Sequence, residues 1–361
     1  MTGMRVADIV QQRLLTQRVA GVPFERPEDM VQWLVGVQSQ DYAGARWSVG
    51  QRTLNCTDAD VRQAFDAGKI LRTHVLRPTW HFVTPADIRW MLQLTAPRVH
   101  ALNAYQYRTL ELNEAVVTHS QTLIADALQG GKQLTRAELA AIFACAGIVA
   151  DGQRLSYIVM RAELDGLICS GALRGKQHTY ALLEERAPEA RTLAHEDALA
   201  ELTLRFFASH GPVTLKDYVR WSGLTVTQAK QGLEMVKHDL AHEIVEGQTY
   251  WFGTLVQPGK PSSMTAYLLP EFDECVLSYK DVNFPDMPWT LDIDSWNDSF
   301  YRPIIIDGMR AGTWRRTLTK DAVVMEARLF TSLDAAQTQA LEAATERYGQ
   351  FMNMPSTLTY I

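Results

Sequence analysis

The order of the predicted elements constrains the fold most, because helices followed by a two-stranded ribbon recur three times along the chain. Each ribbon is rich in β-branched and aromatic residues and contains turn residues. The ribbons are predicted at residues 69–83, 167–183 and 244–252. Helices followed by such a ribbon are typical of a winged-helix unit. The three stretches share no visible sequence similarity, so the chain repeats an architecture rather than a sequence.

Local signals support the helices that precede these ribbons. Pro27 is followed by two acidic residues, which the helix dipole favours in a first turn. Thr135 and Glu138 have the spacing of a capping box, and Gly223 separates two helices at a helix-turn-helix corner. We therefore expect three winged-helix units, over residues 1–113, 114–190 and 191–257.

The character of the chain changes after residues 257–263, which contain two prolines, a glycine and two serines and are the best linker candidate. Asp307-Gly308 is a strong hairpin turn. We expect a β-rich domain over residues 264–361 with a closing helix at 332–351. Its strands are predicted at 265–269, 275–279, 303–306, 310–318 and 322–330. The predicted fold class is mainly α with β hairpins (α+β).

Composition excludes several classes of protein. The 361 residues are 47% hydrophobic and 21% charged, which suits a packed globular core. No run of about 18 apolar residues predicts a membrane span, and the first residues lack signal-peptide character, so we expect a cytoplasmic protein without a membrane partner. The four cysteines have no C-x-x-C spacing. We expect buried free thiols, and neither a zinc site nor a disulfide scaffold.

The net charge of −6 argues mildly against nucleic-acid binding, but the charge is unevenly distributed. Residues 1–110 contain 13 Lys and Arg against 9 Asp and Glu, a balance of +4, and the remainder has a balance of −10. Because salt confines an electrostatic field to about 8–10 Å, a local basic face can bind phosphate on an acidic protein.

Gln38-Ser39-Gln40 lies where an apolar helix runs out. A glutamine amide donates and accepts hydrogen bonds and hardly titrates, so it can hold a water molecule or a base edge. Residues two apart on a helix do not face each other. If both glutamines meet one ligand, the segment must leave helical geometry, which Gly36 and Gly44 permit. The alternative is an ordinary surface loop.

The ribbon at 69–83 carries an unusual density of polar and aromatic side chains, and a winged helix places a helix or a wing in a DNA groove. The alternative is a packed hairpin whose Trp and His side chains are satisfied in the core. The candidates for DNA contact are Arg72, His74, Arg77, Trp80 and His81.

Other candidate chemistry is weaker. His238 and His242 have the spacing of a metal pair on a helix, but no third ligand follows, and we expect no metal site. Glu271, Asp273 and Glu274 are candidate acid–base groups, although solvated acids at a strand end are the better interpretation. Neither a phosphate loop nor a G-x-S-x-G elbow is present, so we expect no cofactor.

Six motifs together resemble the AlkZ/YcaQ-type winged-helix DNA glycosylases. They are QSQD (38–41), RTHVLRPTWHFV (72–83), RWSGL (220–224), LLPEFDE (268–274), YKD (279–281) and GTWRRTL (312–318). The resemblance implies three tandem winged-helix units and a small C-terminal β-barrel-like domain, arranged as a C-shaped clamp around double-stranded DNA. The Gln-x-Gln pattern matches the AlkZ-like branch, whereas the other branch has Gln-x-Asp. Gln38 and Gln40 are then the catalytic residues.

The implied activity is that of a monomeric, monofunctional glycosylase acting on N7-alkylated purines, including bulky adducts and interstrand crosslinks. Alkylation at N7 makes the purine cationic and a good leaving group, so two amides that orient a water molecule suffice. The predicted phosphate contacts are Arg46, Arg52, Arg72 and Arg77. The alternatives are a non-enzymatic winged-helix DNA-binding protein, such as a transcriptional regulator, and a hydrolase that uses the carboxylates of PEFDE.

Overall fold

The structure, a computed structural model, describes residues 4–256, 264–280, 284–288 and 302–361. It divides into two units. The first unit contains Met1–Arg62, Leu204–Tyr218 and Val236–Ile361. The second contains Gln63–Thr203 and Val219–Met235. The predicted linker at 257–263 lies outside the described residues, and the four predicted domain boundaries stay predictions.

The first unit contains the N-terminal helices, a short hairpin and the C-terminal sheet. Its elements outside the sheet are α1 (Val6–Thr16), α2 (Pro27–Leu34), β1 (Val37–Gln38), α3 (Tyr42–Gly50), η1 (Lys237–Asp239), β7 (Ala241–Val245), β8 (Gln248–Phe252) and α13 (Glu274–Leu277). The boundaries between the units fall within α4 (Asp58–Asp66), α10 (His195–His210), α11 (Leu215–Ser222) and α12 (Val226–Val236).

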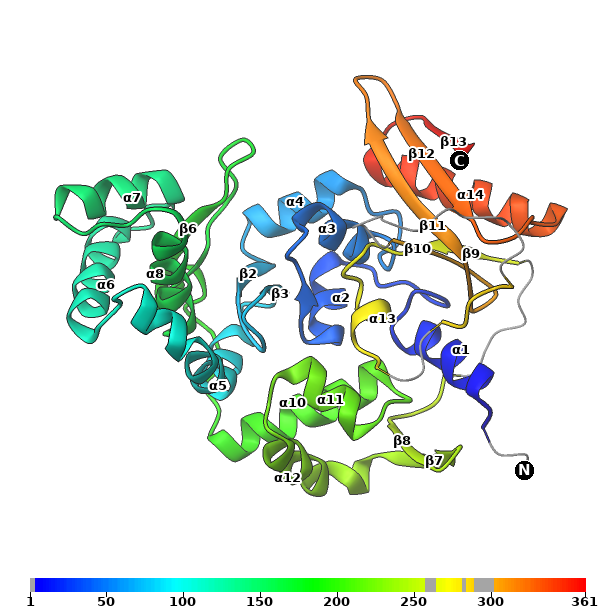
Figure 1. Cartoon of the computed structure of the whole chain (residues 1–361), viewed down its shortest axis with the longest axis horizontal. Helices are drawn as coiled ribbons and strands as arrows, with labels where there is room; N and C mark the ends of the chain where they lie inside the picture. The colour runs from blue at the N-terminus through cyan, green and yellow to red at the C-terminus, as the bar shows by residue number, and fades with distance from the viewer. Residues whose placement is uncertain (1–3, 257–263, 281–283, 289–301) are drawn as a thin grey trace. The chain divides into compact units, whose positions relative to one another are not determined.

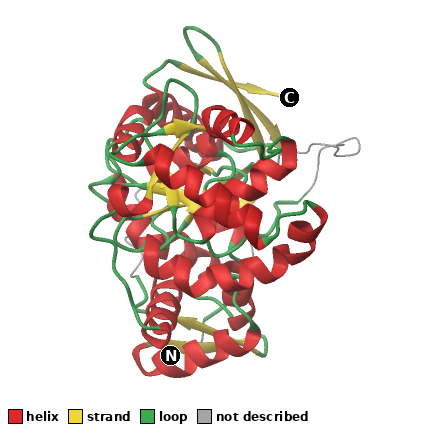
Figure 2. Ribbon diagram, turned by 90° about the vertical axis from the view of Figure 1, so that its left-hand side faces the viewer, coloured by secondary structure: helices red, strands yellow, loops and turns green. Residues whose placement is uncertain are grey.

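Five strands in the order β13-β12-β11-β10-β9 form a curled half-barrel sheet in the first unit. Neighbours pair antiparallel except β12 and β13, which are parallel. The helix α14 (Ala335–Met352) packs on the sheet beside the long β11–β12 ribbon (Figure 1). Figure 2 shows that ribbon with the C-terminal strand next to it. The strands are β9 (Ala266–Leu268), β10 (Pro303–Ile306), β11 (Met309–Leu318), β12 (Val323–Leu329) and β13 (Ser356–Tyr360).

The second unit contains a hairpin, a long helix and a helical bundle capped by a three-stranded sheet of order β4-β6-β5. Leu139, Phe143 and Ile158 lie at the centre of its core. The elements are β2 (Leu71–His74), β3 (Trp80–Val83), α5 (Ile88–Thr109), α6 (Glu114–Leu128), β4 (Leu134–Thr135), α7 (Arg136–Cys145), α8 (Gly152–Leu164), β5 (Ile168–Ser170), β6 (Thr179–Leu182) and α9 (Leu183–Arg186).

Several predicted local signals are confirmed. Thr135 and Glu138 form the capping box of α7, with each side chain bonded to the backbone N–H of the other residue. Gly223 has a φ of +70°, and a Cβ there would lie 2.4 Å from the carbonyl oxygen of Leu76. The corner between α11 and α12 therefore requires glycine. In the part of the chain that the structure describes, no helix is long and apolar enough to cross a membrane.

One predicted strand is wrong, and some elements were not predicted. Residues 275–279 were expected as a strand, but Asp273 caps a helical turn, α13, by accepting the N–H of Cys275 at 2.9 Å. α3 and β13 were not predicted. α3 contains two glycines, which disfavour helix, and a Cβ on Gly50 would lie 2.2 Å from the ring of Phe351. Contact with α14 therefore selects glycine in this helix.

The surroundings of the histidine pair and of two cysteines also differ from those expected. His238 lies in η1 and His242 in β7, so they are not neighbours on one helix face. Cys145 is exposed and Cys56 is partly buried, whereas only Cys169 and Cys275 are buried as expected.

Candidate functional site

The Gln-x-Gln motif lies in an extended segment between two helices of the first unit. α2 ends at Leu34, and Val35 has a φ of +68°, which turns the chain out of the helix. β1 follows, and α3 begins after Asp41, whose carboxylate accepts the N–H of Ala43 at 3.1 Å. The segment therefore leaves helical geometry, which two glutamines acting on one ligand require.

The two glutamines differ in their surroundings. Gln38 is 8% exposed and Ser39 is completely buried, whereas Gln40 is exposed. Gln38 is therefore buried inside the protein, whereas Gln40 meets solvent.

The main chain at Gln38 is held by Glu274. Oε1 of Glu274 accepts the backbone N–H of Gln38 at 2.8 Å, and Oε2 accepts the hydroxyl of Ser278 at 3.0 Å. Nε2 of His210 lies 3.9 Å from the same Oε2. Glu274 is completely buried, so the expectation of a solvated acid at a strand end is wrong. A backbone N–H and a hydroxyl donate to its two oxygens instead.

The adjacent Asp273 forms a buried bidentate ion pair with Arg52. Nη2 lies 2.6 Å from Oδ1 and Nη1 lies 2.8 Å from Oδ2, and both side chains are completely buried. Asp273 also accepts the hydroxyl of Ser48 at 2.7 Å. Burial opposes the charge of Arg52, but the neighbouring Asp273 raises the pKa of this guanidinium above its usual value. The pair fastens α13 to α3.

Arg52 was predicted to contact phosphate, and this prediction is wrong. Its guanidinium is completely buried and bound to Asp273 and to the carbonyl oxygen of Gln17. A buried guanidinium in a bidentate pair has a structural role. Arg46 is different, because it is partly exposed, pairs with Asp58 and lies over the ring of Tyr42.

A group of arginines lies near the start of α3. Nη2 of Arg302 lies 3.5 Å from Oδ2 of Asp41, the N-cap residue of α3. Burial lowers the pKa of Arg316 to about 10, and repulsion from Arg302 and Arg46 contributes. These cations are therefore close enough to repel one another. The motif GTWRRTL (312–318) contains Arg316, but nothing in the sequence predicted that this residue lies near Asp41.

Glu271 is the first carboxylate of the PEFDE motif (270–274), and it is partly exposed. Burial raises the pKa of Glu271 and the nearby Asp41 raises it further, whereas Arg302 opposes both effects. The three acids of this motif thus have separate roles: Glu271 lies among the charges near α3, Asp273 holds α3, and Glu274 holds Gln38.

The hairpin formed by β2 and β3 is packed within the second unit. Nδ1 of the buried His74 lies 2.5 Å from Oε2 of the buried Glu163. The guanidinium of Arg72 lies 4.3 Å from the ring centroid of Trp80. Arg72, His74 and His81 are each at most 8% exposed. The side chains of these three residues are therefore packed in the hairpin, and their contact with DNA stays a prediction.

The remaining two candidates on this hairpin are partly exposed. Arg77 donates to the carbonyl oxygen of Arg220 at 3.2 Å, and the indole N–H of Trp80 donates to Glu163 at 3.4 Å. Both stay predictions as DNA contacts.

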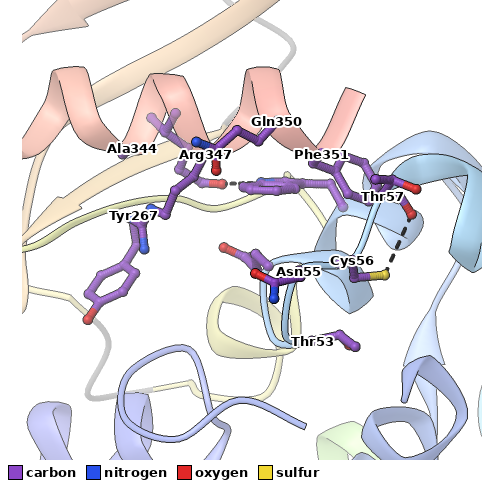
Figure 3. Close-up of a pocket in the computed structure, with 13 residues that line it drawn as sticks. Thr53, Asn55, Cys56, Thr57, Tyr267, Ala344, Arg347, Gln350 and Phe351 are labelled. Carbon is purple, nitrogen blue, oxygen red and sulfur yellow. Dashed lines mark hydrogen bonds between the residues drawn. The ribbon is translucent and has the colours of Figure 1, made fainter. Parts of the chain in front are cut away.

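A cavity of about 350 Å³ lies beside α3 and α14 (Figure 3), and neither motif glutamine is among the residues that line it. Trp47 and Phe351 form part of its wall, and Cys56 lies on the loop that follows α3. Burial raises the pKa of the Cys56 thiol to about 12, with the nearby Asp60 and Asp58 adding to the shift. The thiol is therefore protonated and a poor nucleophile. Among the described residues, no group of three His, Cys, Asp or Glu has the arrangement of a metal site.

The buried ion pair predicts a large coupling energy. Arg52→Met leaves Asp273 buried without its cation, so we expect the free energy of unfolding to fall by about 3–5 kcal/mol. Asp273→Asn should also destabilise, and the double variant should lose less than the sum of the two. Urea unfolding of the four proteins measures this cycle. Additive losses would contradict a direct pair.

His210 predicts a loss of stability in acid. Burial lowers its pKa in the folded protein, with Glu274 opposing and Arg52 reinforcing that effect. The unfolded chain therefore binds the proton first as the pH falls below about 6.5, and folding stability falls with it. Urea unfolding at pH 7.5, 6.0 and 5.0 should show a steeper decline for the wild type than for His210→Gln. Parallel declines would contradict a buried neutral imidazole.

The chain is similar to known DNA glycosylases in sequence and in fold. The family model described as "DNA glycosylase AlkZ-like" matches residues 31–351. An interstrand DNA cross-link repair glycosylase from Streptomyces sahachiroi is 24% identical over 225 residues, and the match spans 60% of each chain.

The fold is also that of a solved protein. The structure of the DNA glycosylase AlkZ from Streptomyces sahachiroi is similar with a TM-score of 0.77 and 17% identity, covering 99% of this chain and 100% of that one. The motifs at 38–41, 72–83 and 312–318 lie within the matched residues. Because the family model spans most of the sequence, this chain belongs to the AlkZ-like DNA glycosylase family.

Proposed function

We propose that this protein is a monofunctional DNA glycosylase that hydrolyses the N-glycosidic bond of N7-alkylated purines in duplex DNA. The observation that carries the proposal is the extended Gln-x-Gln segment, in which a fixed, buried Gln38 is followed by an exposed Gln40. Membership of the AlkZ-like family supports the same chemistry.

The proposed reaction needs positioning more than proton transfer. An N7-alkylated purine is cationic, so it leaves with the electron pair of the C1′–N9 bond, and the sugar develops positive charge. The amide oxygens of Gln38 and Gln40 accept hydrogen bonds from a water molecule and orient its oxygen toward C1′. The water oxygen forms the new bond to C1′, and it then loses a proton to solvent. Orientation and electrostatic stabilisation provide most of the rate gain.

The lesions are proposed from the relatives. The Streptomyces sahachiroi protein is named as an interstrand cross-link repair glycosylase. On that ground we propose that bulky N7 adducts and interstrand crosslinks are substrates of this protein, which would act in base-excision repair. The carboxylates of PEFDE are poor candidates for a different hydrolase, since Asp273 and Glu274 are completely buried.

The DNA contacts are proposed from charge and exposure. Arg46, Arg302 and Arg316 lie near the start of α3, and the β11–β12 ribbon of the same unit carries the exposed Arg315 and Lys320. Such cations neutralise phosphates without reading sequence. The recurring helices and hairpins are proposed as three winged-helix units, and Arg77 and Trp80 as secondary DNA contacts.

Substitution of the two amides tests the proposal. Gln38→Ala and Gln40→Ala should each lower single-turnover release of N7-methylguanine from a duplex, by about 100-fold for the more important residue, because the water loses its orientation. Binding of the duplex should change by less than about threefold, since phosphate contacts dominate it. Gln153→Ala, an exposed glutamine at the start of α8, is the matched control and should be unchanged.

Two outcomes would oppose this reading. Release that survives both substitutions would remove the motif from catalysis. If the wild type releases neither N7-methylguanine nor a bulky N7 adduct but prefers one DNA sequence, a transcriptional regulator becomes the better interpretation.

Leaving-group charge predicts the substrate range. A neutral lesion such as hypoxanthine should be released at least about 100-fold more slowly than N7-methylguanine. Two amides supply neither a general acid that protonates the leaving nucleobase nor a strong general base that activates the water. Single-turnover assays of the two duplexes under identical conditions measure the ratio. Comparable rates would show that another group activates the leaving base.

A further inference from the structure

We propose that Glu274 is a positioning residue that fixes the main chain of the Gln-x-Gln segment through its hydrogen bond to the N–H of Gln38. This inference rests on the proposed function, in which Gln38 orients the attacking water, because it explains how the segment that carries Gln38 is held. Glu274 itself does not contact substrate in this role.

Glu274 is well placed to set the position of Gln38. The two residues are 236 positions apart in sequence, yet Oε1 lies 2.8 Å from the backbone nitrogen of Gln38. The carboxylate is completely buried, and its other oxygen accepts the Ser278 hydroxyl. A side chain with both oxygens engaged has one orientation, so the backbone donor that it binds is also fixed.

The main chain next to Glu274 is itself held in place by the preceding residue. Asp273 caps α13 and forms the bidentate pair with Arg52, near the end of α3. Two consecutive carboxylates therefore hold the chain on both sides of the motif: Glu274 holds the strand before Ser39, and Asp273 holds the helix after Asp41. The exposed Gln40 lies between these two fixed points.

The role is geometric and does not require a charge. A glutamine at position 274 retains a carbonyl oxygen that accepts the N–H of Gln38, and its NH₂ group can donate to the Ser278 hydroxyl. An alanine retains neither contact and leaves a buried backbone donor without its acceptor. Glu274→Gln and Glu274→Ala therefore separate the hydrogen bond from the charge.

Asp217 offers a matched control in the same unit. It is 3% exposed, and its Oδ1 accepts the backbone N–H of Lys280 at 2.9 Å. Asp217→Ala thus removes a buried carboxylate that holds another segment, and it should lower stability without touching the motif.

The test combines amide hydrogen exchange over residues 37–41 with single-turnover release of N7-methylguanine. Glu274→Ala should exchange at least about tenfold faster in this segment and release base about 100-fold more slowly, with the affinity for DNA within about threefold. Glu274→Gln should stay within about fivefold of the wild type in both measurements. Asp217→Ala should match the wild type in both.

The inference is overturned if Glu274→Ala leaves exchange at 37–41 unchanged, or if it releases base within threefold of the wild type. It is also overturned if Asp217→Ala reproduces both effects, because general loss of stability then explains them. A wild type that releases no N7-alkylated base refutes the proposed function, and the exchange comparison still decides whether Glu274 fixes the segment.

Discussion

The first unit depends on the buried ion pair between Arg52 and Asp273. Two charges without solvent are costly to bury, and only bidentate geometry with further hydrogen bonds offsets the loss of hydration. Asp273 receives those bonds from Ser48 and from the N–H of Cys275. The pair therefore does more than join two segments. Asp273 also caps α13, and the next residue, Glu274, lies within hydrogen-bond distance of the N–H of Gln38.

The three carboxylates of the PEFDE motif lie in different electrostatic surroundings. Asp273 neutralises a buried cation, Glu274 binds neutral donors, and Glu271 is partly exposed near Asp41 and Arg302. Chemically similar carboxyl groups thus acquire different tasks through their neighbours. Gln38 and Gln40 also differ in their surroundings, since Gln38 is buried with its main chain held by Glu274, whereas Gln40 is exposed.

Much of the secondary structure was predictable, because caps, glycines and periodic apolar residues act locally. The capping box at Thr135 and the corner at Gly223 are examples. α3 was not predictable in this way, since Gly50 is selected by Phe351, a residue 301 positions away. Arg52 was misjudged for a related reason: sequence shows that a residue is cationic, but burial and the partner Asp273 arise only from tertiary structure. The Gln-x-Gln segment was singled out from its residues and its catalytic role came from the family resemblance, whereas its support by Glu274 was not predicted.

The long sequence separations also bear on how the protein is made. Gln38 meets Glu274 across 236 residues and Arg52 meets Asp273 across 221, so the N-terminal segment reaches its anchors only after the ribosome has synthesised most of the chain. Contacts of this range are slow to form because loop closure costs entropy before any contact is gained. During synthesis the segment around Arg52 therefore lacks the carboxylate of Asp273, and Gln38 cannot form its hydrogen bond to Glu274 until that residue has been made.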